Sequence, residues 1–477
     1  MPFNITERQK QSSLQNIQNR FVRIKLLNYQ FQTIDEISGV VTSGNISINA
    51  NSDIRRTGSL NIVVQDSTFE VGASSKVWLD KYVQVFVDID HIISGKRVET
   101  NCGIFIIDAP KYQFDPSTNT LTLSLLDLMA KLTGIRNGYL KGIPTRFPAG
   151  EDIRQAIIGT LGLGGFTKYI VEAPQGNGKI PTDLEFNAGA TVYELLTGLR
   201  DIYPNYEMFF DIDGTFYYKP IPTGANDPVV IGDDVWESIV TSEGIGTDFQ
   251  NIKNSIEVYG RTHSPQFYAS NVSVSGRNIL LTINTSYADG VIYGFSITNT
   301  TAIQSPLIKI SGATTPSGYL QTITDSYNTV VIPASTTPVY YCVQYVANGM
   351  NNSPCFRWLG HVQAYGFAED TNPNSPFYVN GTVGRIRLPL FGGEYENCIS
   401  DDLAQQRAEY ELWLHTNMKN TVTLQCVPTP WMDVNQLVEY TLQRNGQTNQ
   451  YLIKSINMGL GATDSMTVEM IQYYPNP

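Results

Sequence analysis

Histidine is the side chain best suited to proton transfer and transition-metal binding near neutral pH, and this chain has four. They are scattered at His91, His263, His361 and His415, in different predicted elements. No H-E-x-x-H, G-x-S-x-G or phosphate-binding loop is present in the sequence. Acidic pairs occur, but the sequence places no two of them across a cleft, as a glycosidase requires. We therefore predict no catalytic residue, no metal or cofactor site and no enzymatic activity.

Two carboxylates close together, Asp211 and Asp213, are a second candidate, because carboxylate oxygens suit Ca²⁺. The glutamate that closes an EF-hand loop is missing from the expected position. Asp213-Gly214 lies between two aromatic stretches, and this dipeptide is the strongest short signal for a β-hairpin. We favour a hairpin turn over a calcium site.

Two adjacent arginines, Arg55 and Arg56, lie between predicted strands at 44–49 and 58–64. Two guanidinium groups side by side could grip the carboxylates of a partner. Such pairs are more often solvated, so we interpret this one as the solvent-facing end of a loop.

The five cysteines lie far apart, are odd in number and show no C-x-x-C spacing. Neither a disulfide framework nor a zinc site is therefore supported. Cys342 and Cys355 could pair in principle, but free buried thiols are favoured for the whole set. The N-terminal segment is polar, and no apolar run is long enough to span a membrane. We expect the protein to fold in a cytoplasm. The cysteines are Cys102, Cys342, Cys355, Cys398 and Cys426.

The composition is that of a β-rich particle or surface protein. A chain of 477 residues is expected to form roughly three or four domains. Charged residues are only 16% of the chain, whereas Tyr and Gly are plentiful at 27 and 39. The net charge of −12 argues against binding nucleic acid by phosphate neutralisation. It is compatible with DNA that passes by without sticking.

A pattern of three strands occurs twice in the chain. Trp431-Met432-Asp433 precedes one copy and Trp78-Leu79-Asp80 the other. In both, apolar residues alternate and Gly, Asn or Asp turns separate the strands, which predicts an antiparallel meander. The agreement of triplet, strands and turns in order predicts one fold used twice. The strands are expected at 437–442, 451–456 and 466–470, and at 83–87, 103–107 and 121–125.

Between the two copies the chain changes character. Apolar residues at helical spacing predict a helix over 151–161, and Thr191-x-x-Glu194 is a capping box that starts a second helix. We predict an N-terminal arm, a first β domain, a small α+β domain, a linker with the start of a second β domain, an insert, and the remainder of the second β domain. The respective bounds are 1–20, 21–133, 134–223, 224–263, 264–374 and 375–477.

The insert is distinguished by its lack of charge. Residues 264–368 contain five charged residues in 105 and many Thr, Ser, Asn and Tyr. Short apolar stretches such as 279–283 and 339–343 predict an inserted β-sandwich. Exposed Tyr and Asn with Trp358 could stack on sugars, but we favour a spacer that packs against neighbouring chains.

This succession of segments resembles the hub proteins of phage tails, which form the baseplate hub or tail-tip ring. The resemblance covers roughly 20–262 and 375–477, and 264–368 departs from a minimal hub. It is carried mainly by 431–435 and by the Arg407–Leu414 helix. It implies a mainly β fold with a small α+β domain: two tube-like β-barrel or sandwich domains plus the inserted β-sandwich.

The resemblance also implies a function. Two tube-like domains in each of three chains would make a homotrimer with a pseudo-sixfold ring. The ring would join the tail tube or distal tail protein above to a tip, spike or tape-measure protein below. DNA would pass through its channel unbound, which suits the acidic balance. The protein would be a virion structural component of the tail tip or baseplate, assembled in the host cytoplasm.

Two alternatives belong to other functional classes. A glycan-binding tail adhesin would act through the 264–374 insert. A β-rich polysaccharide hydrolase would need a carboxylate pair in a cleft.

Overall fold

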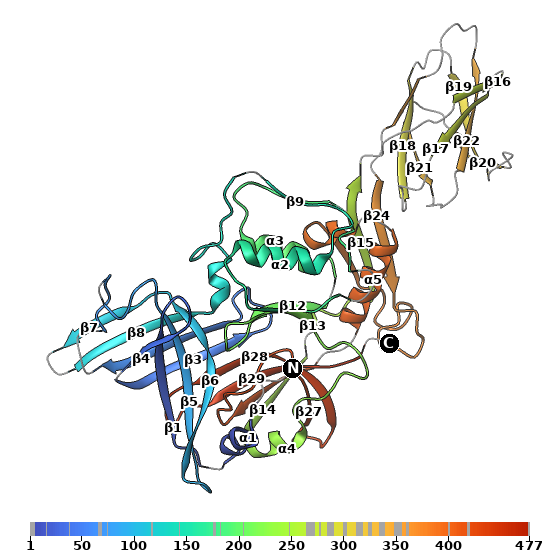
Figure 1. Cartoon of the computed structure of the whole chain (residues 1–477). Helices are drawn as coiled ribbons and strands as arrows, with labels where there is room; N and C mark the ends of the chain where they lie inside the picture. The colour runs from blue at the N-terminus through green and yellow to red at the C-terminus, as the bar shows by residue number, and fades with distance from the viewer. Residues whose placement is uncertain are drawn as a thin grey trace. The chain divides into compact units, whose positions relative to one another are not determined.

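The computed structural model describes the chain from residue 5 to 475 (Figure 1). Two compact parts are present, Met1–Gln250 with Met418–Pro477, and Asn251–Asn417. Side chains are described outside 262–363. The description omits 16, 38, 65–68, 74, 116–117, 143, 175–177, 182, 204, 248, 264–271, 276–277, 284–290, 299–302, 312–317, 323–326, 333–338, 348–354, 359–361, 399–400 and 417–419.

The first part is built on one 13-stranded sheet. Its order is β14-β26-β29-β28-β3-β4-β8-β6-β5-β1-β2, with β27 paired to β28 and β7 to β8. The strands are β1 (Arg20–Leu27), β2 (Thr33–Glu36), β3 (Gly39–Asn49), β4 (Arg56–Val64), β5 (Tyr82–His91), β6 (Lys96–Ile107), β7 (Lys111–Asp115), β8 (Thr118–Leu126), β14 (Val240–Thr247), β26 (Asn420–Cys426), β27 (Leu437–Thr441), β28 (Thr448–Gly459) and β29 (Met466–Gln472).

The same strand order occurs twice in this sheet. The first repeat runs β3-β4-β8-β6-β5, and the second runs β14-β26-β29-β28-β27. Both predicted meanders are confirmed within this order. In the first repeat β5 pairs antiparallel with β6 and β6 with β8, and in the second β27 pairs antiparallel with β28 and β28 with β29. Figure 1 shows the first set in blue to cyan and the second set in red apart from its green first strand, β14; the two sets meet where β28 lies beside β3.

Matching hydrogen bonds confirm that the two repeats share fine geometry. Both first strands have a bulge at a threonine, and the Thr42 and Thr241 hydroxyls donate to the carbonyls of Asn61 and Gln425 at 3.2 and 3.0 Å. The side-chain oxygens of Asn61 and Gln425 also accept a bond each, from the hydroxyls of threonines in β8 and β29. A bulge and two side-chain bonds at matching positions indicate one structural unit used twice.

Both repeats contribute to one apolar core. The alternating strands direct Leu60 and Leu123 of the first repeat and Leu424 and Val468 of the second into the same cluster. Helix α4 (Asp233–Ile239) adds Trp236, which is fully buried. Helix α1 (Glu7–Ser13) starts at a capping box formed by Thr6 and a glutamine.

The predicted α+β segment packs against the large sheet. Helices α2 (Ile153–Leu163) and α3 (Val192–Arg200) bury their apolar faces in a second cluster, which Leu27, Ile104 and Ile106 of the sheet complete. The predicted helices and the Asp213-Gly214 hairpin are confirmed. The domain bounds themselves stay predictions. The short elements are η2 (Leu128–Lys131), β9 (Thr145–Phe147), β10 (Tyr169–Val171), β11 (Leu184–Phe186), β12 (Tyr206–Phe210) and β13 (Phe216–Pro220).

The second part contains a three-stranded sheet, β24-β15-β25, covered by helix α5. We predict β15, β25 and α5 in the second β domain and β24 in the insert, but these elements form one cluster of their own instead. The reason is that Ile256 and Val258 of β15 share one apolar cluster with Ala404 and Ala408 of α5. The bounds are β15 (Ser255–His263), β24 (Val362–Glu369), β25 (Arg387–Phe391), η5 (Gly393–Asn397) and α5 (Asp401–Thr416).

The insert is made of antiparallel strands, as predicted. They form a five-stranded sheet, β16-β17-β22-β19-β20, and a three-stranded sheet, β21-β18-β23. The bounds are β16 (Val272–Ser275), β17 (Asn278–Ile283), β18 (Val291–Thr298), β19 (Ile303–Ser311), β20 (Gly318–Thr322), β21 (Tyr327–Ile332), β22 (Val339–Ala347) and β23 (Cys355–Trp358).

The capping box of α3 provides a stability test. The Thr191 hydroxyl accepts from the Glu194 amide at 3.1 Å, and the Glu194 carboxylate accepts from the Thr191 amide at 2.7 Å. Thr191→Ala leaves that helix amide without its partner and should lower the free energy of unfolding by about 1 kcal/mol in urea denaturation. Thr191→Ser keeps the hydroxyl and should be close to wild type. Equal losses in both variants would contradict the capping role.

Candidate functional site

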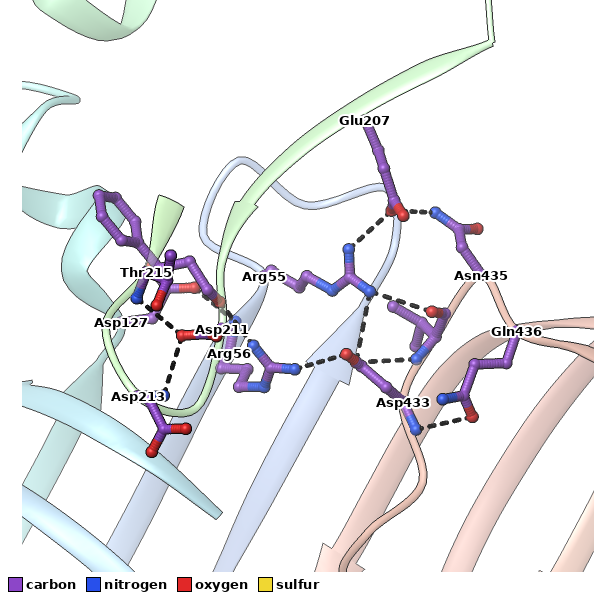
Figure 2. Close-up of polar contacts among 12 residues, drawn as sticks. Arg55, Arg56, Asp127, Glu207, Asp211, Asp213, Thr215, Asp433, Asn435 and Gln436 are labelled. Carbon is purple, nitrogen blue, oxygen red and sulfur yellow. Dashed lines mark hydrogen bonds and ion pairs between the residues drawn. The ribbon is translucent and has the colours of Figure 1, made fainter. Parts of the chain in front are cut away.

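The densest cluster of buried charge surrounds the two adjacent arginines at the start of β4. Arg55 and Arg56 are both buried, so their interpretation as a solvated loop end is wrong. They do bind carboxylates, but these belong to the same chain. Figure 2 shows their guanidinium groups extending toward residues of β12 and of the 433–436 loop. We call this cluster the arginine clasp.

Arg56 links three segments of the chain. Its Nη2 donates to Asp433 Oδ2 at 2.6 Å, and its Nη1 donates to the Phe210 carbonyl at 2.6 Å. Its backbone amide donates to Asp127 at 2.9 Å, just where β8 ends. One side chain therefore joins β4, the end of β12 and the loop before β27.

Arg55 binds the other side of the same loop. Its Nη1 donates to Glu207 Oε2 at 2.7 Å, and its Nη2 donates to the Val434 carbonyl at 3.0 Å and lies 3.3 Å from Asp433 Oδ1. The guanidinium carbon lies 3.8 Å from the centroid of the Phe209 ring, a cation–π contact. Asp433 thus receives both arginines.

A second layer of polar groups surrounds Glu207. Asn435 donates its side-chain amide to Glu207 Oε2 at 2.6 Å, and Lys219 lies 3.3 Å from the other oxygen. The Asn435 side-chain oxygen accepts from Lys454 at 3.0 Å. The backbone of Asn435 has φ +56°, a region that asparagine tolerates better than most residues. The loop is therefore held by its backbone shape as well as by charge.

The protonation states follow from burial and opposite charge. Burial opposes ionisation of Asp433, but the charges of Arg55 and Arg56 hold its pKa below the ordinary value. Burial also disfavours the charged form of Arg55, yet Asp433 and Glu207 raise its pKa. Asp433 and Arg55 are therefore ionised at neutral pH. The charges of the clasp are compensated within the chain, so the clasp ties distant segments of the chain together.

Two neighbouring groups have shifted pKa values for a different reason. Burial raises the pKa of Asp127 to about 6, although backbone amides of Arg56 and Met129 oppose the shift. Burial lowers the pKa of Lys454 to about 8, and the charge of Glu207 only partly offsets it. Both shifts come mainly from loss of solvent.

The two Trp-Leu/Met-Asp triplets differ in their surroundings. Trp431 and Asp433 are buried, and Asp433 joins the clasp. Trp78 is 36% exposed, and Asp80 pairs only with neighbouring Lys81 among the described ion pairs. The triplet therefore marks the same point in the strand order but has no common role.

The other residues considered as sites are not brought together. The Asp211 side chain accepts from the amides of Asp213 and Thr215, at 2.9 and 2.7 Å, so it shapes the hairpin turn. His91 Nδ1 lies 2.7 Å from Ser94 Oγ. His415, near the end of α5, has its Nδ1 2.7 Å from the Asn251 carbonyl oxygen. The side chains of His263 and His361 lie outside the described residues.

Within the described residues, no group of three or more His, Cys, Asp or Glu could hold a metal ion. No described helix has the length and apolar character needed to cross a membrane. Cys102, Cys398 and Cys426 are free and buried, as favoured. The side chains of Cys342 and Cys355 are outside the description.

Sequence reasoning missed the partners of the arginines. Glu207, Asp127 and Asp433 come from distant segments, and no local pattern links them to β4. The repeat itself left a signal that was not used: Val41-Thr42-Ser43 and Val240-Thr241-Ser242 are identical and stand at the two bulges.

Removing the shared carboxylate tests the clasp. Asp433→Asn keeps the side-chain shape but leaves two buried guanidinium groups without their common counter-ion. It should lower the free energy of unfolding by about 3 kcal/mol, measured by urea denaturation with tryptophan fluorescence. The matched control is Asp80→Asn in the other triplet, an exposed position that should change stability by less than about 0.5 kcal/mol. Similar effects in both variants would contradict the distinction.

Lys454 predicts a pH dependence. Since its pKa is about 8 in the folded chain and about 10.4 in the unfolded chain, the unfolded chain binds more protons between these values. The stability of the wild type relative to Lys454→Met should therefore rise with pH from about 8 to 10, by at most about 1.4 kcal/mol per pH unit. Urea denaturation at several pH values measures it, with Lys96→Met as an exposed control. A flat difference would contradict the burial of charge.

Comparison with known proteins places these features in context. A family model described as a domain of unknown function (DUF5048) matches residues 374–476. No curated protein matches the chain by sequence. Among solved structures, the tail protein from Neisseria meningitidis MC58 is similar with a TM-score of 0.50 and 10% identity, over 95% of this chain and 97% of that one.

The 43 kDa tail protein of prophage MuSo2 from Shewanella oneidensis is similar with a TM-score of 0.51 and 13% identity, over 95% of this chain and 98% of that one. Both matches extend over nearly the whole of each chain, so they concern the entire architecture and not one shared domain. The chain therefore has the fold of these tail proteins.

Proposed function

We propose that this chain is a structural hub protein of a phage tail tip or baseplate. Three chains would form a pseudo-sixfold ring that joins the tail tube to the tip and leaves a channel for DNA. The observation that carries the proposal is the five-strand repeat that occurs twice in one sheet, joined edge to edge where β28 pairs with β3. A chain that holds two similar units side by side needs three copies to make six.

Three further observations support this function. The fold is shared with phage tail proteins over nearly the full length of both chains. The clasp is a buried tie with compensated charges, which suits a chain that acts as a rigid part and not as an enzyme. The net charge of −12 suits a channel through which DNA moves without binding.

The proposed partners follow from the place of a hub. The ring would meet the tail tube or a distal tail protein on one side, and a tip, spike or tape-measure protein on the other. The protein would lie in the virion after assembly in the host cytoplasm. A glycan-binding role of 264–374 gains no support from the structure, because it depends on side chains mostly outside the described part, and it stays a prediction.

The mass of the purified protein in solution tests the ring. Light scattering should give three times the 53.0 kDa of one chain, because two similar units per chain complete a sixfold ring only at three copies. Negative-stain images of the same peak should show six lobes around a hole. A stable dimer or tetramer, or a monomer at every concentration up to several milligrams per millilitre, would contradict the trimeric ring.

A further inference from the structure

The two repeats meet at a strand pair that we call the internal junction. There β28 runs antiparallel to β3, with Met458 opposite Ile46 and Asn457 opposite Ser47. The Asn45 side chain donates to the side-chain oxygen of Asn457 at 2.9 Å, and the Leu460 amide donates to the Gly44 carbonyl at 3.0 Å. The end of β28 in the second repeat, together with Leu460 just after it, is thereby joined to β3, the first strand of the first repeat.

Each strand of the internal junction has a counterpart in the opposite repeat, and the matching threonines identify it. The bulged Thr42 and Thr241 align β3 with β14, so that Ile245 corresponds to Ile46. Thr122 and Thr467 align β8 with β29, and their partners across the hairpin are Lys111 and Asn457. Strand β7 in the first repeat therefore corresponds to the end of β28 in the second.

Both counterparts have one edge without a strand partner in the described part of the chain. Strand β7 pairs only with β8, and β14 pairs only with β26, at the end of the 13-stranded sheet. The outer half of β14, Gly244–Thr247, carries no charged residue and no proline. Charged residues and prolines normally prevent an edge strand from pairing with another chain, so this edge lacks that protection.

Burial differs between the repeats at the positions that the internal junction covers. Ile46 is 1% exposed in β3, whereas its counterpart Ile245 is 38% exposed in β14. Leu460 is 6% exposed, whereas Phe114, which corresponds to it after β7 is aligned with β28, is 72% exposed. Nearer the start of the two strands, residues 41–44 of β3 and 240–243 of β14 are exposed to a similar degree, position by position. The difference therefore begins where β3 has a neighbour and β14 has none.

We propose that the free edges of β7 and β14 pair with each other between two copies of this chain, in the register of the internal junction. Tyr112 then lies opposite Ile245 of the next copy, Lys111 opposite Gly246 and Gln113 opposite Gly244. The contact is head to tail, and it buries Phe114 and Ile245. Closure after three chains rests on the proposed function, and it makes six equivalent junctions, three within chains and three between them.

Cysteine pairs test the register. Lys111 and Gly246 are both exposed, and a Cβ at Gly246 would lie 3.9 Å from the Thr421 carbonyl oxygen, so Lys111→Cys with Gly246→Cys should fold. Residues directly opposite each other in a sheet have Cβ atoms about 5 Å apart. Oxidation, or a short bis-maleimide, should give covalent dimers and trimers on a denaturing gel. Each single variant is the background control, since the described native thiols are buried.

The control for register is Lys111→Cys with Ile245→Cys. A shift of one residue points the side chain to the opposite face of the sheet, so this pair should cross-link at least about tenfold less. Equal cross-linking of the two pairs would overturn the register, and no intermolecular cross-link in either would overturn the edge contact.

A charge at the edge tests the contact without thiols. Ile245 is already partly exposed in the single chain, so Ile245→Lys should fold, but an intermolecular junction would bury its ammonium group. The protein concentration for half-maximal trimer, from light scattering, should rise at least about tenfold. The matched control is Ile34→Lys, at an exposed residue on the edge strand β2. It should leave the concentration for half-maximal trimer unchanged.

The outcomes separate this inference from the hub function. A wild-type trimer that is unaffected by Ile245→Lys and gives no cross-link would overturn the edge pairing, while the trimeric hub would stand. A wild-type chain that is monomeric and gives no cross-link would overturn both. A cross-linked ladder that continues beyond three chains would support the edge pairing and contradict closure at three.

Discussion

The peptide groups along a strand edge must find hydrogen-bond partners, and this requirement organises the large sheet. At the internal junction, β28 supplies those partners to β3, and the two repeats become one sheet with one core. Were the repeats separate, β3 would expose an edge together with Ile46 and Ile48, which are buried in the joined sheet. The junction is therefore where the duplicated unit becomes a single structure.

The arginine clasp fixes what is attached to that sheet. Two buried cations and two buried carboxylates contribute little net stability compared with a well-packed apolar core, because their desolvation offsets their attraction. Their value is geometric. The contacts of Arg56 with Asp433 and with the Phe210 carbonyl fit only one placement of β12 and of the loop before β27. The clasp thereby determines how the α+β segment, which contains β12, lies on the first repeat.

The sequence revealed the elements but not their long-range partners. Alternation and turns predicted both meanders, and Asp213-Gly214 and the Thr191 capping box predicted a hairpin and a helix, because these signals are local. The burial of Arg55 depends on Glu207, far away in the chain, so a local pattern favoured solvent instead. Strand β15 alternates like a strand of the large sheet, and only its packing on α5 assigns it elsewhere.

The two repeats have diverged at one end while their edges remain alike. In the first repeat the backbone amide of Arg56 donates to Asp127, whereas the corresponding residues of the second repeat are neutral, and the Asn420 side chain donates to Gln472 at 2.8 Å. The Arg56 side chain also donates to the Phe210 carbonyl of the α+β segment, and in the described part of the chain Asn420 and Gln472 make no such bond. In the proposed ring, similar edges around the channel would give near-sixfold symmetry. The attached segments, held by every second repeat, would give threefold symmetry. A single chain could then match both, because its edge contacts and its clasp involve different residues.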